Sequence, residues 1–391
     1  MIKNQDFLKK ENQILVLKLI IDKGPISRAE IAKKTKMSPT SASRIVAVLV
    51  QHELIREIEA KTDTVGRKAT YFVPNESAVI SAGIEINKEV VRIGFLNFVG
   101  ELIAIKSYHF VPEDPSVTAE FVKCKLFEMM KHKNIHRARL AGICVGLPGL
   151  IDHKKGNVKL SAQFNWKDIP FLELLRSKID LPLYIDNELK LQALAEYNRG
   201  GNSKQENMVV ISFGSGVGSA LISKGEIYRG EDNFAGEIGH TIVDPLGAYC
   251  PCGNFGCLQT YIAEQFLLDE ASKTKKLNSI DDLISVAKEG EKWASNILDK
   301  ATTYAALTVN NVICLNNPDV VVLTGSLVVN HPEIREEVLR KCKDQIWSAA
   351  AETFRLDTTE MGSEGVVVGA ALSVQRKYLK EINLDHEEFS V

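Results

Sequence analysis

The sequence predicts an α/β protein in which an N-terminal winged helix-turn-helix precedes a larger domain of alternating strands and helices. Three observations lead to this expectation. The N-terminal region is basic and contains three short helical patterns, strands alternate with helices after it, and three cysteines and a histidine cluster between residues 240 and 257. The segment Pro74-Asn75-Glu76-Ser77 is typical of a hinge, so we expect domains at residues 1–75 and 76–391.

The charge of the chain is unevenly distributed. The net charge is −2, yet residues 1–75 hold 14 lysines or arginines against 8 acidic residues. Such a basic segment favours a polyanion such as nucleic acid as its partner, although a solvated surface can have the same composition. The helical pattern within the segment therefore has to decide between a nucleic-acid-binding segment and a solvated surface.

The composition also bounds where the protein works. No apolar run reaches about 18 residues and no apolar signal segment opens the chain, so we expect a cytoplasmic protein with no membrane segment. Seven cysteines, an odd number, suit a reducing compartment. We expect the four cysteines outside the cluster to lie in the core: Cys124, Cys144, Cys314 and Cys342.

Three helices are predicted in the first 52 residues. Apolar residues in 12–21 suit a buried helix. A second helix starts at Ser27, where Glu30 completes a capping box, and runs to about Lys36. A third opens at Pro39 after the cap Ser38 and runs to about His52. Three short helices with a tight second turn indicate a helix-turn-helix.

The third helix and a following wing are the predicted DNA contacts. The helix begins with small polar residues and one guanidinium, which fit a major groove. Strands at 54–59 and 70–73 flank the basic loop 61–68, which can reach phosphates or a minor groove. Helix-turn-helix packing also occurs in proteins that bind no DNA, but the polar helix start and basic wing favour DNA binding. The predicted contacts are Thr40, Ser41, Ser43, Arg44, Arg67 and Lys68.

Beyond the hinge the pattern indicates an α/β domain. A glycine-rich turn at 214–218 joins two of its strands, as in a hairpin. The predicted strands are 80–86, 90–98, 102–106, 140–145, 183–185, 208–212, 217–223 and 320–323, and the clearest helices are 117–131 and 171–178.

The strongest chemical signal is the set His240, Cys250, Cys252 and Cys257. Three thiols and one imidazole within this short run suit a closed tetrahedral zinc site. Gly253 and Gly256 let the backbone fold back on itself. Four protein ligands leave no open position, so we expect a structural Zn²⁺ and disfavour a zinc sensor, which needs an exchangeable ion. The alternative is three unrelated buried cysteines beside a core histidine.

The motifs around this cluster resemble the ROK family of repressors, open reading frames and sugar kinases. The resemblance rests on Gly236-Glu-Ile-Gly-His240, on Cys250 to Tyr261 and, in the family's order, on Gly146–Asp152, Asn165-Trp166, Leu181-Pro182 and Asn187-Glu188. It covers residues 78 to about 380 and implies an actin-like, sugar-kinase fold of two lobes. With the winged helix in front, the chain is similar to the repressor branch.

The resemblance also implies a sugar site. Glu237 would direct its carboxylate toward sugar hydroxyls beside the zinc ligand His240, and Asn187 matches the family's sugar-binding asparagine. The residues carried over to this site are Gly149, Asn187, Glu188, Glu237, His240 and Gln259.

Departures from the kinases of the family argue against phosphoryl transfer. The first phosphate loop resembles Asp-X-Gly-Gly-Thr in the family but reads Glu85-Ile-Asn-Lys-Glu89 here, with carboxylates where phosphates would lie. Glu188 replaces the catalytic aspartate, as it does in the family's xylose regulators. Lys190 and Gln259 replace family residues too, and could favour a phosphorylated or acidic sugar, although a helical lysine is most often solvent-facing.

We therefore expect a zinc-containing, sugar-responsive transcriptional repressor of carbohydrate-utilisation genes, similar to the xylose regulators and without enzymatic turnover. Its partners would be operator DNA and a sugar or sugar-phosphate inducer. A palindromic operator requires at least a homodimer, and a homotetramer also fits. The alternative is a ROK-type sugar kinase with an appended DNA-binding domain.

Overall fold

The computed structural model describes residues 5–59, 70–199, 202, 205–350, 352–382 and 384. The predicted wing residues Arg67 and Lys68 lie outside these ranges. The chain forms two compact units: unit 1 comprises 1–146, 169–185 and 370–391, and unit 2 comprises 147–168 and 186–369. Within the described residues, no helix is both long enough and apolar enough to cross a membrane.

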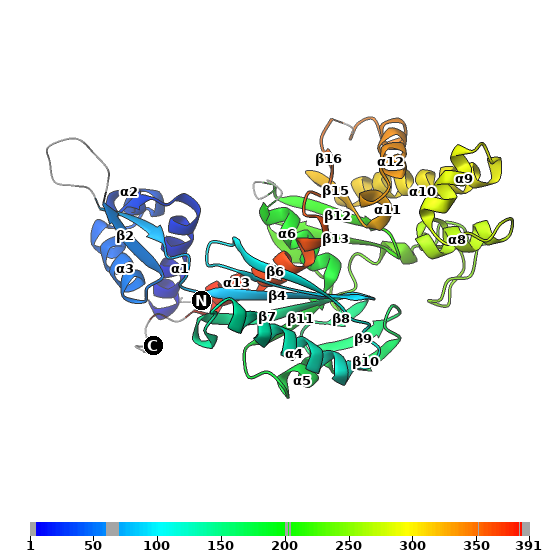
Figure 1. Cartoon of the computed structure of the whole chain (residues 1–391). Coiled ribbons are helices and arrows are strands. Elements are labelled where there is room, and N and C mark those ends of the chain that lie inside the picture. Colours follow the sequence, from blue (N-terminus) through cyan, green and yellow to red (C-terminus); the bar gives the residue numbers. More distant parts are fainter. Residues whose placement is uncertain are drawn as a thin grey trace. The chain divides into compact units, whose positions relative to one another are not determined.

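Unit 1 opens with the predicted winged helix-turn-helix (Figure 1). Ser27 caps the second helix in the predicted capping box with Glu30, and Ser38 caps the third. The first helix is longer than predicted because the polar, charged residues before position 12 also favour a helix and need no buried face. The elements are α1 (Gln5–Lys23), β1 (Ile26–Ser27), α2 (Arg28–Thr35), α3 (Pro39–Gln51), β2 (Ile55–Glu59) and β3 (Thr70–Pro74), with sheet order β1-β3-β2.

The core of the winged helix continues past residue 75. Phe72, which is fully buried, shares one apolar cluster with Phe98 and with Leu379 and Leu384 near the C-terminus. The ring nitrogen Nε2 of His52 lies 3.1 Å from the carbonyl oxygen of Leu384. The division of the chain at residue 75 therefore stays a prediction, because apolar packing crosses it within unit 1.

The rest of unit 1 is a mixed five-stranded sheet with the order β11-β7-β4-β5-β6. Strands β4, β5 and β6 form an antiparallel meander, and β7 joins β4 in parallel. The elements are β4 (Ile80–Ile86), β5 (Val90–Leu96), β6 (Leu102–His109), α4 (Pro115–His132), β7 (Leu140–Leu147), α5 (Phe171–Arg176), β11 (Leu183–Asn187) and α13 (Gly365–Glu381), which begins in unit 2.

Unit 2 repeats this topology in a second five-stranded sheet, β14-β13-β12-β15-β16. Again three strands form an antiparallel meander and the fourth joins the first in parallel. The two sheets thus share one strand order, 3-2-1-4-5, although the sequence shows no clear internal repeat. The strands are β12 (Asn207–Phe213), β13 (Val217–Ser223), β14 (Glu226–Tyr228), β15 (Val320–Thr324) and β16 (Arg355–Thr358).

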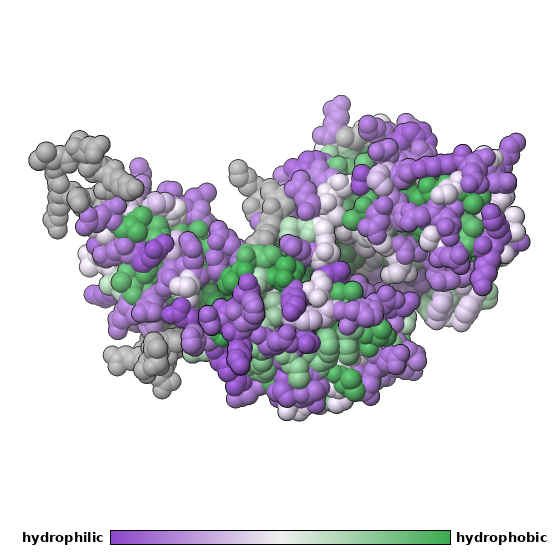
Figure 2. Space-filling view, viewed as in Figure 1, coloured by the Kyte–Doolittle hydropathy of each residue, from purple (hydrophilic) through white to green (hydrophobic). Residues whose placement is uncertain are grey.

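Helices and a small three-stranded sheet complete unit 2. The helices α7 to α12 supply most of its apolar core, and hydrophilic side chains cover most of the face of α9 and α12 that Figure 2 shows. The elements are β8 (Leu150–Asp152), β9 (Asn157–Ser161), β10 (Trp166–Ile169), α6 (Glu188–Arg199), α7 (Gln259–Ile262), α8 (Glu264–Ser272), α9 (Ile280–Lys288), α10 (Lys292–Asn316), α11 (Ser326–Val329) and α12 (Pro332–Gln345).

The expectation about the remaining cysteines is correct for two of the four. Cys144 and Cys342 are buried, but Cys124 and Cys314 are exposed. Both exposed cysteines lie on outward faces of amphipathic helices, α4 and α10, where a small thiol is tolerated in either environment.

Candidate functional site

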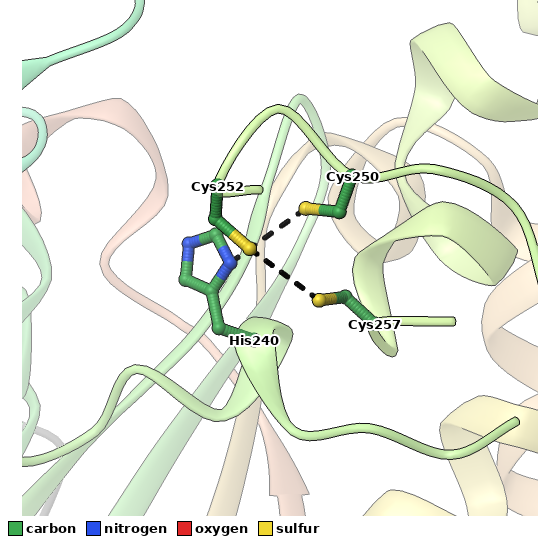
Figure 3. A group of neighbouring side chains, drawn as sticks. All are labelled: His240, Cys250, Cys252 and Cys257. Carbon is green, nitrogen blue, oxygen red and sulfur yellow. Dashed lines mark hydrogen bonds between the residues drawn. The ribbon is translucent and has the colours of Figure 1, made fainter. Parts of the chain in front are cut away.

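Four side chains converge at the start of the helical part of unit 2. His240 ends a short 3-10 turn (Ile238–His240), and Cys250, Cys252 and Cys257 lie on the loop that leads to α7. Figure 3 shows all four pointing toward one another. Their ligand atoms lie within 4.8 Å of one another, with 3.6 Å between the sulfurs of Cys252 and Cys257 and 3.8 Å between Cys250 Sγ and His240 Nδ1.

These separations suit a metal ion. Sulfur ligands about 2.3 Å from a tetrahedral ion are about 3.8 Å from one another. The backbone N–H of Asn254 lowers the pKa of Cys252 and so favours its thiolate, whereas burial raises the pKa of Cys257 to about 12. The predicted cluster is therefore able to hold a metal ion.

The loop conformation explains its glycines. A Cβ on Gly256, whose φ is +64°, would lie 1.5 Å from the carbonyl oxygen of Asp244. Tyr261 on α7 donates a hydrogen bond from Oη to Asp244 Oδ2 over 2.8 Å, which connects this part of the loop to α7. Gly256 is therefore required for the loop to close on itself, as the sequence predicts.

Gln259 lies against this cluster. Its Nε2 donates to Cys250 Sγ over 3.1 Å. An amide that donates to a ligating sulfur stabilises the thiolate and fixes its direction. The described contact of Gln259 is thus with a cysteine of the candidate metal cluster, and its predicted contact with sugar stays a prediction.

Glu237 is held immediately before the cluster by two glycines. Cβ atoms on Gly236 and Gly239 would lie 1.9 and 2.2 Å from the carbonyl oxygens of Ser219 and Val217 on β13, so only glycine lets this segment pack there. Burial raises the pKa of Glu237, and its neighbours Lys190 and His240 lower it by less. Among the described residues, no group donates a hydrogen bond to this carboxylate, which leaves it able to accept hydroxyl groups.

Asn187 ends β11 and organises the start of α6. Its Nδ2 donates to the carbonyl oxygen of Gly149 over 3.0 Å, and its Oδ1 accepts the backbone N–H groups of Leu189 and Lys190. Two of the predicted sugar-site residues, Asn187 and Gly149, are therefore in direct contact. Glu188 follows as the first residue of α6.

Lys190 is buried, contrary to the expectation for a helical lysine. Only 2% of it is exposed, and its Nζ donates to the carbonyl oxygen of Asn233 over 2.7 Å. Burial lowers the pKa of Lys190, and the carboxylates of Asp186 and Glu237 oppose this shift. The acceptor carbonyl is 43 residues away in the sequence, which is why the helical pattern alone gave no sign of it.

Sequence reasoning also missed the ion pair beside Lys190. Arg229 holds Asp186 in a bidentate pair, with N–O distances of 2.8 and 2.6 Å. Asn233 accepts from the same guanidinium and donates its Nδ2 to the carbonyl oxygen of Ile151. Asp186 could have been suspected because it precedes Asn187, but no pattern in the sequence connects it with Arg229.

Glu85 is not an isolated negative charge in the segment that the sequence matched to the family's first phosphate loop. It pairs across β4 and β5 with Arg92, with an N–O distance of 2.6 Å. Burial raises the pKa of Glu85 and Arg92 lowers it by less. The expected repulsion of phosphate by Glu85 is therefore corrected: this carboxylate is occupied by a cation, because its strand position faces Arg92.

The predicted recognition helix presents its polar residues to solvent. Thr40, Ser41 and Arg44 are exposed on the first turns of α3, and Ser43 is half-buried. The hydroxyl of Ser38 bonds that of Ser41 over 2.9 Å, which fixes the start of the helix. Their contact with DNA stays a prediction.

Comparison with known proteins identifies the class. The ROK family model matches residues 82–377 and the MarR family model matches residues 10–64. The chain belongs to the ROK family. A winged helix in front of the ROK domain is the domain arrangement of transcriptional repressors in this family.

Two similar curated proteins match along nearly their whole length. The xylose repressor of Bacillus subtilis (strain 168) is 27% identical over 383 residues, covering 98% of this chain and 100% of the repressor. The transcriptional dual regulator NagC of Escherichia coli (strain K12) is 28% identical over 397 residues, covering 98% and 97%.

Solved structures share the fold. A ROK family transcriptional regulator described as a homologue of the E. coli MLC protein has a TM-score of 0.80 at 24% identity, covering 95% of this chain and 97% of that one. A ROK hexokinase from Thermus thermophilus has a TM-score of 0.69 at 23% identity, covering 77% and 100%. The kinase lacks a counterpart for about a quarter of this chain.

Replacing Cys257 by Ser should remove the bound metal and lower the thermal midpoint of unit 2, because three remaining ligands bind more weakly and leave the loop without its cross-link. Elemental analysis of the purified protein, together with thermal unfolding, measures both effects. Cys342→Ser is the matched control, since Cys342 is buried but outside the cluster. Equal metal content in the two variants would contradict the assignment.

Proposed function

We propose that this chain is a sugar-responsive repressor of carbohydrate-utilisation genes that acts on operator DNA in the cytoplasm, with its domains divided near residue 75. The observation that supports it best is the joining of a winged helix-turn-helix to a ROK domain in which Glu237 directly precedes a candidate metal cluster. The full-length similarity to a xylose repressor and to NagC supports the same proposal.

The inducer in this proposal is a neutral sugar, with xylose as the first candidate. Lys190 is the cation that could have selected a phosphate, but its ammonium group donates to a carbonyl oxygen inside unit 2. Arg229 is paired with Asp186. The positive charges of these two residues are balanced by the carboxylates of Asp186 and Glu237. The neighbourhood therefore has little net charge to attract an anion. Sugar hydroxyls suit the carboxylate of Glu237.

The metal in this proposal is a structural Zn²⁺ held by His240, Cys250, Cys252 and Cys257. Thiolate ligands select zinc over the harder divalent cations, and a set of three sulfurs and one nitrogen is common in structural zinc sites. Zinc bound there has no open position and supplies rigidity alone. Gln259 orients the ligand Cys250, and His240 fixes the segment that carries Glu237.

The chain in this proposal does not phosphorylate sugar. Glu188 stands in place of the catalytic aspartate of the kinases and is one methylene longer, which moves its carboxylate. The segment 85–89 lacks the glycines that bring backbone N–H groups to phosphates. An assay for ATP-dependent phosphorylation of the inducing sugar tests this point, and measurable turnover would favour the kinase alternative.

Arg44→Ala should weaken operator binding by about 1 to 3 kcal/mol if its guanidinium reads a base, and should reduce the preference for operator over unrelated DNA. Binding to both DNAs at fixed salt concentration measures the effect. Lys18→Ala removes the same charge from the exposed surface of α1 and is the control. Should both variants bind operator as the unmodified protein does, α3 is not the recognition helix.

Glu237→Ala should bind operator normally but no longer release it when the sugar is added. The reason is that release needs a ligand with different affinities for two conformations, and this variant loses its acceptor for sugar hydroxyls. Operator binding with and without xylose, and the thermal shift caused by xylose, measure the effect.

The control for this experiment is Glu231→Ala, an exposed glutamate nearby. It should respond to sugar as the unmodified protein does. Normal induction of the Glu237→Ala variant would contradict the assignment of Glu237.

A further inference from the structure

Helix α13 is one continuous helix that belongs to both units of the chain (Figure 1). It runs from Gly365 to Glu381, and the division between the units falls after Gly369. The other three divisions fall within the strands β7, β10 and β11. A helix closes its backbone hydrogen bonds within itself and spans about 1.5 Å per residue. A displacement of the first turn of α13 therefore moves its last turn, which lies in the other unit.

Helix α6 carries candidate sugar-site residues at its beginning. Asn187 accepts the backbone N–H groups of Leu189 and Lys190 with its side-chain oxygen, over 3.0 and 3.1 Å. Glu188 is the first residue of the helix. A ligand that moves the side chain of Asn187 therefore acts directly on the first turn of α6.

Two glycines bring the beginning of α13 against α6. A Cβ on Gly369 would lie 1.8 Å from the carbonyl oxygen of Leu191, and a Cβ on Gly365 would lie 2.1 Å from Oε1 of Gln192. Glycine is less favourable than alanine inside a helix, so this close approach is the physical reason for Gly369. Leu191 and Gln192 follow Asn187 by little more than one helical turn. The α13 contact is thus next to the candidate sugar site on the same helix.

A hydrogen-bonded network holds the same junction. Gln192, which is buried, donates from Nε2 to Glu196 Oε1 over 3.0 Å and to Thr359 Oγ1 over 3.4 Å. Thr359 donates its hydroxyl to Glu196 and accepts the backbone N–H of Met361. Thr359 and Met361 lie on the segment that leads from β16 into α13. Breaking these bonds would leave buried polar groups unpaired, so α6 and the beginning of α13 are expected to move together.

The other end of α13 is part of the core of the winged helix. Leu379 is buried in the same apolar cluster as Val46 and Leu49 of α3. Lys10 on α1 donates from Nζ to the carbonyl oxygen of Glu381 over 3.2 Å. The last turn of α13 therefore contacts the core that positions the predicted recognition helix, and it cannot shift without disturbing that core.

We propose that α6 and α13 form the mechanical connection between the candidate sugar site and the winged helix, with the contact of Gly369 and Leu191 as the point where the two helices are joined. This inference rests on the proposed function, in which this chain binds both sugar and operator. Sugar shifts the operator equilibrium only if it has different affinities for two arrangements of this connection. The coupling is reciprocal, so operator must weaken sugar binding by the factor by which sugar weakens operator binding.

Gly369→Ala tests the connection, because the added methyl group has to push α13 away from the carbonyl oxygen of Leu191. In the unmodified protein, xylose should weaken operator binding by about 5- to 150-fold, and operator should weaken xylose binding by the same factor. In the variant each ligand should still bind alone, but both factors should fall to about twofold or less. Calorimetric titration of xylose with and without operator, and operator binding with and without xylose, measure the two factors.

Gln192→Ala is the second variant, and it decides the question if Gly369→Ala does not fold. It removes the side chain that contacts Gly365 and holds Thr359, and should lower both factors by about threefold or more. Ser373→Ala is the matched control, because Ser373 is a half-buried residue of α13 past the junction. It should leave both factors unchanged. Circular dichroism shows whether each variant is folded.

The outcomes separate this inference from the proposed function. If the unmodified protein binds no operator, or binds it equally with and without xylose, the proposed function fails and the inference fails with it. If the unmodified protein responds to xylose and the folded variants at Gly369 and Gln192 respond equally, only the connection through α13 is overturned. Equal loss of coupling in Ser373→Ala would overturn it as well.

Discussion

Convergence of four side chains on one point is the constraint on which the loop from His240 to Cys257 depends. The described loop backbone forms no long strand or helix: two isolated β-bridges, Ile242 to Cys257 and Tyr249 to Phe255, and short turn hydrogen bonds, such as that from Gly256 N–H to the carbonyl oxygen of Ala248, hold it together. Its large apolar residues, such as Leu246, are exposed instead of forming a core. A metal ion held by the four side chains would add folding free energy to such a loop, where little apolar surface is buried.

The position of Glu237 follows from this constraint. The carboxylate lies three residues before His240, and the glycines on either side of Glu237 pack against β13. His240 joins one end of the segment to the cysteine cluster, and the sheet packs against its body. A carboxylate held in this way is preorganised. A ligand that binds it would therefore spend little binding free energy on ordering the site.

The two sheets share one topology but support different tasks. The sheet of unit 1 belongs to the part of the chain whose apolar residues, including Phe98, complete the core of the winged helix. In unit 2 the glycines that flank Glu237 pack against β13 of the sheet, and the cluster around Asp186, Arg229 and Lys190 belongs to the same unit. The same fold thus provides a platform for the DNA-binding elements in one unit and for the candidate ligand site in the other.

The amino-acid sequence alone determined the features that depend on neighbours a few residues apart. The capping box of Ser27 and Glu30, the strands with apolar runs and the metal-ligand set within 240–257 all follow from local hydrogen bonding, periodicity and spacing. The roles of the ROK residues came from resemblance to a family and could not be obtained from these rules.

Tertiary structure decided the rest. Lys190 is buried because a carbonyl oxygen 43 residues away accepts a hydrogen bond from its ammonium group, and Asp186 is paired because Arg229 lies near it at the end of an equally distant strand. Cys314 is exposed because the other side of α10 already fills the core. Periodicity in the sequence indicates which side of its own helix a residue lies on. Burial and charge pairing depend on which distant segment packs against that side, and only the folded chain determines this.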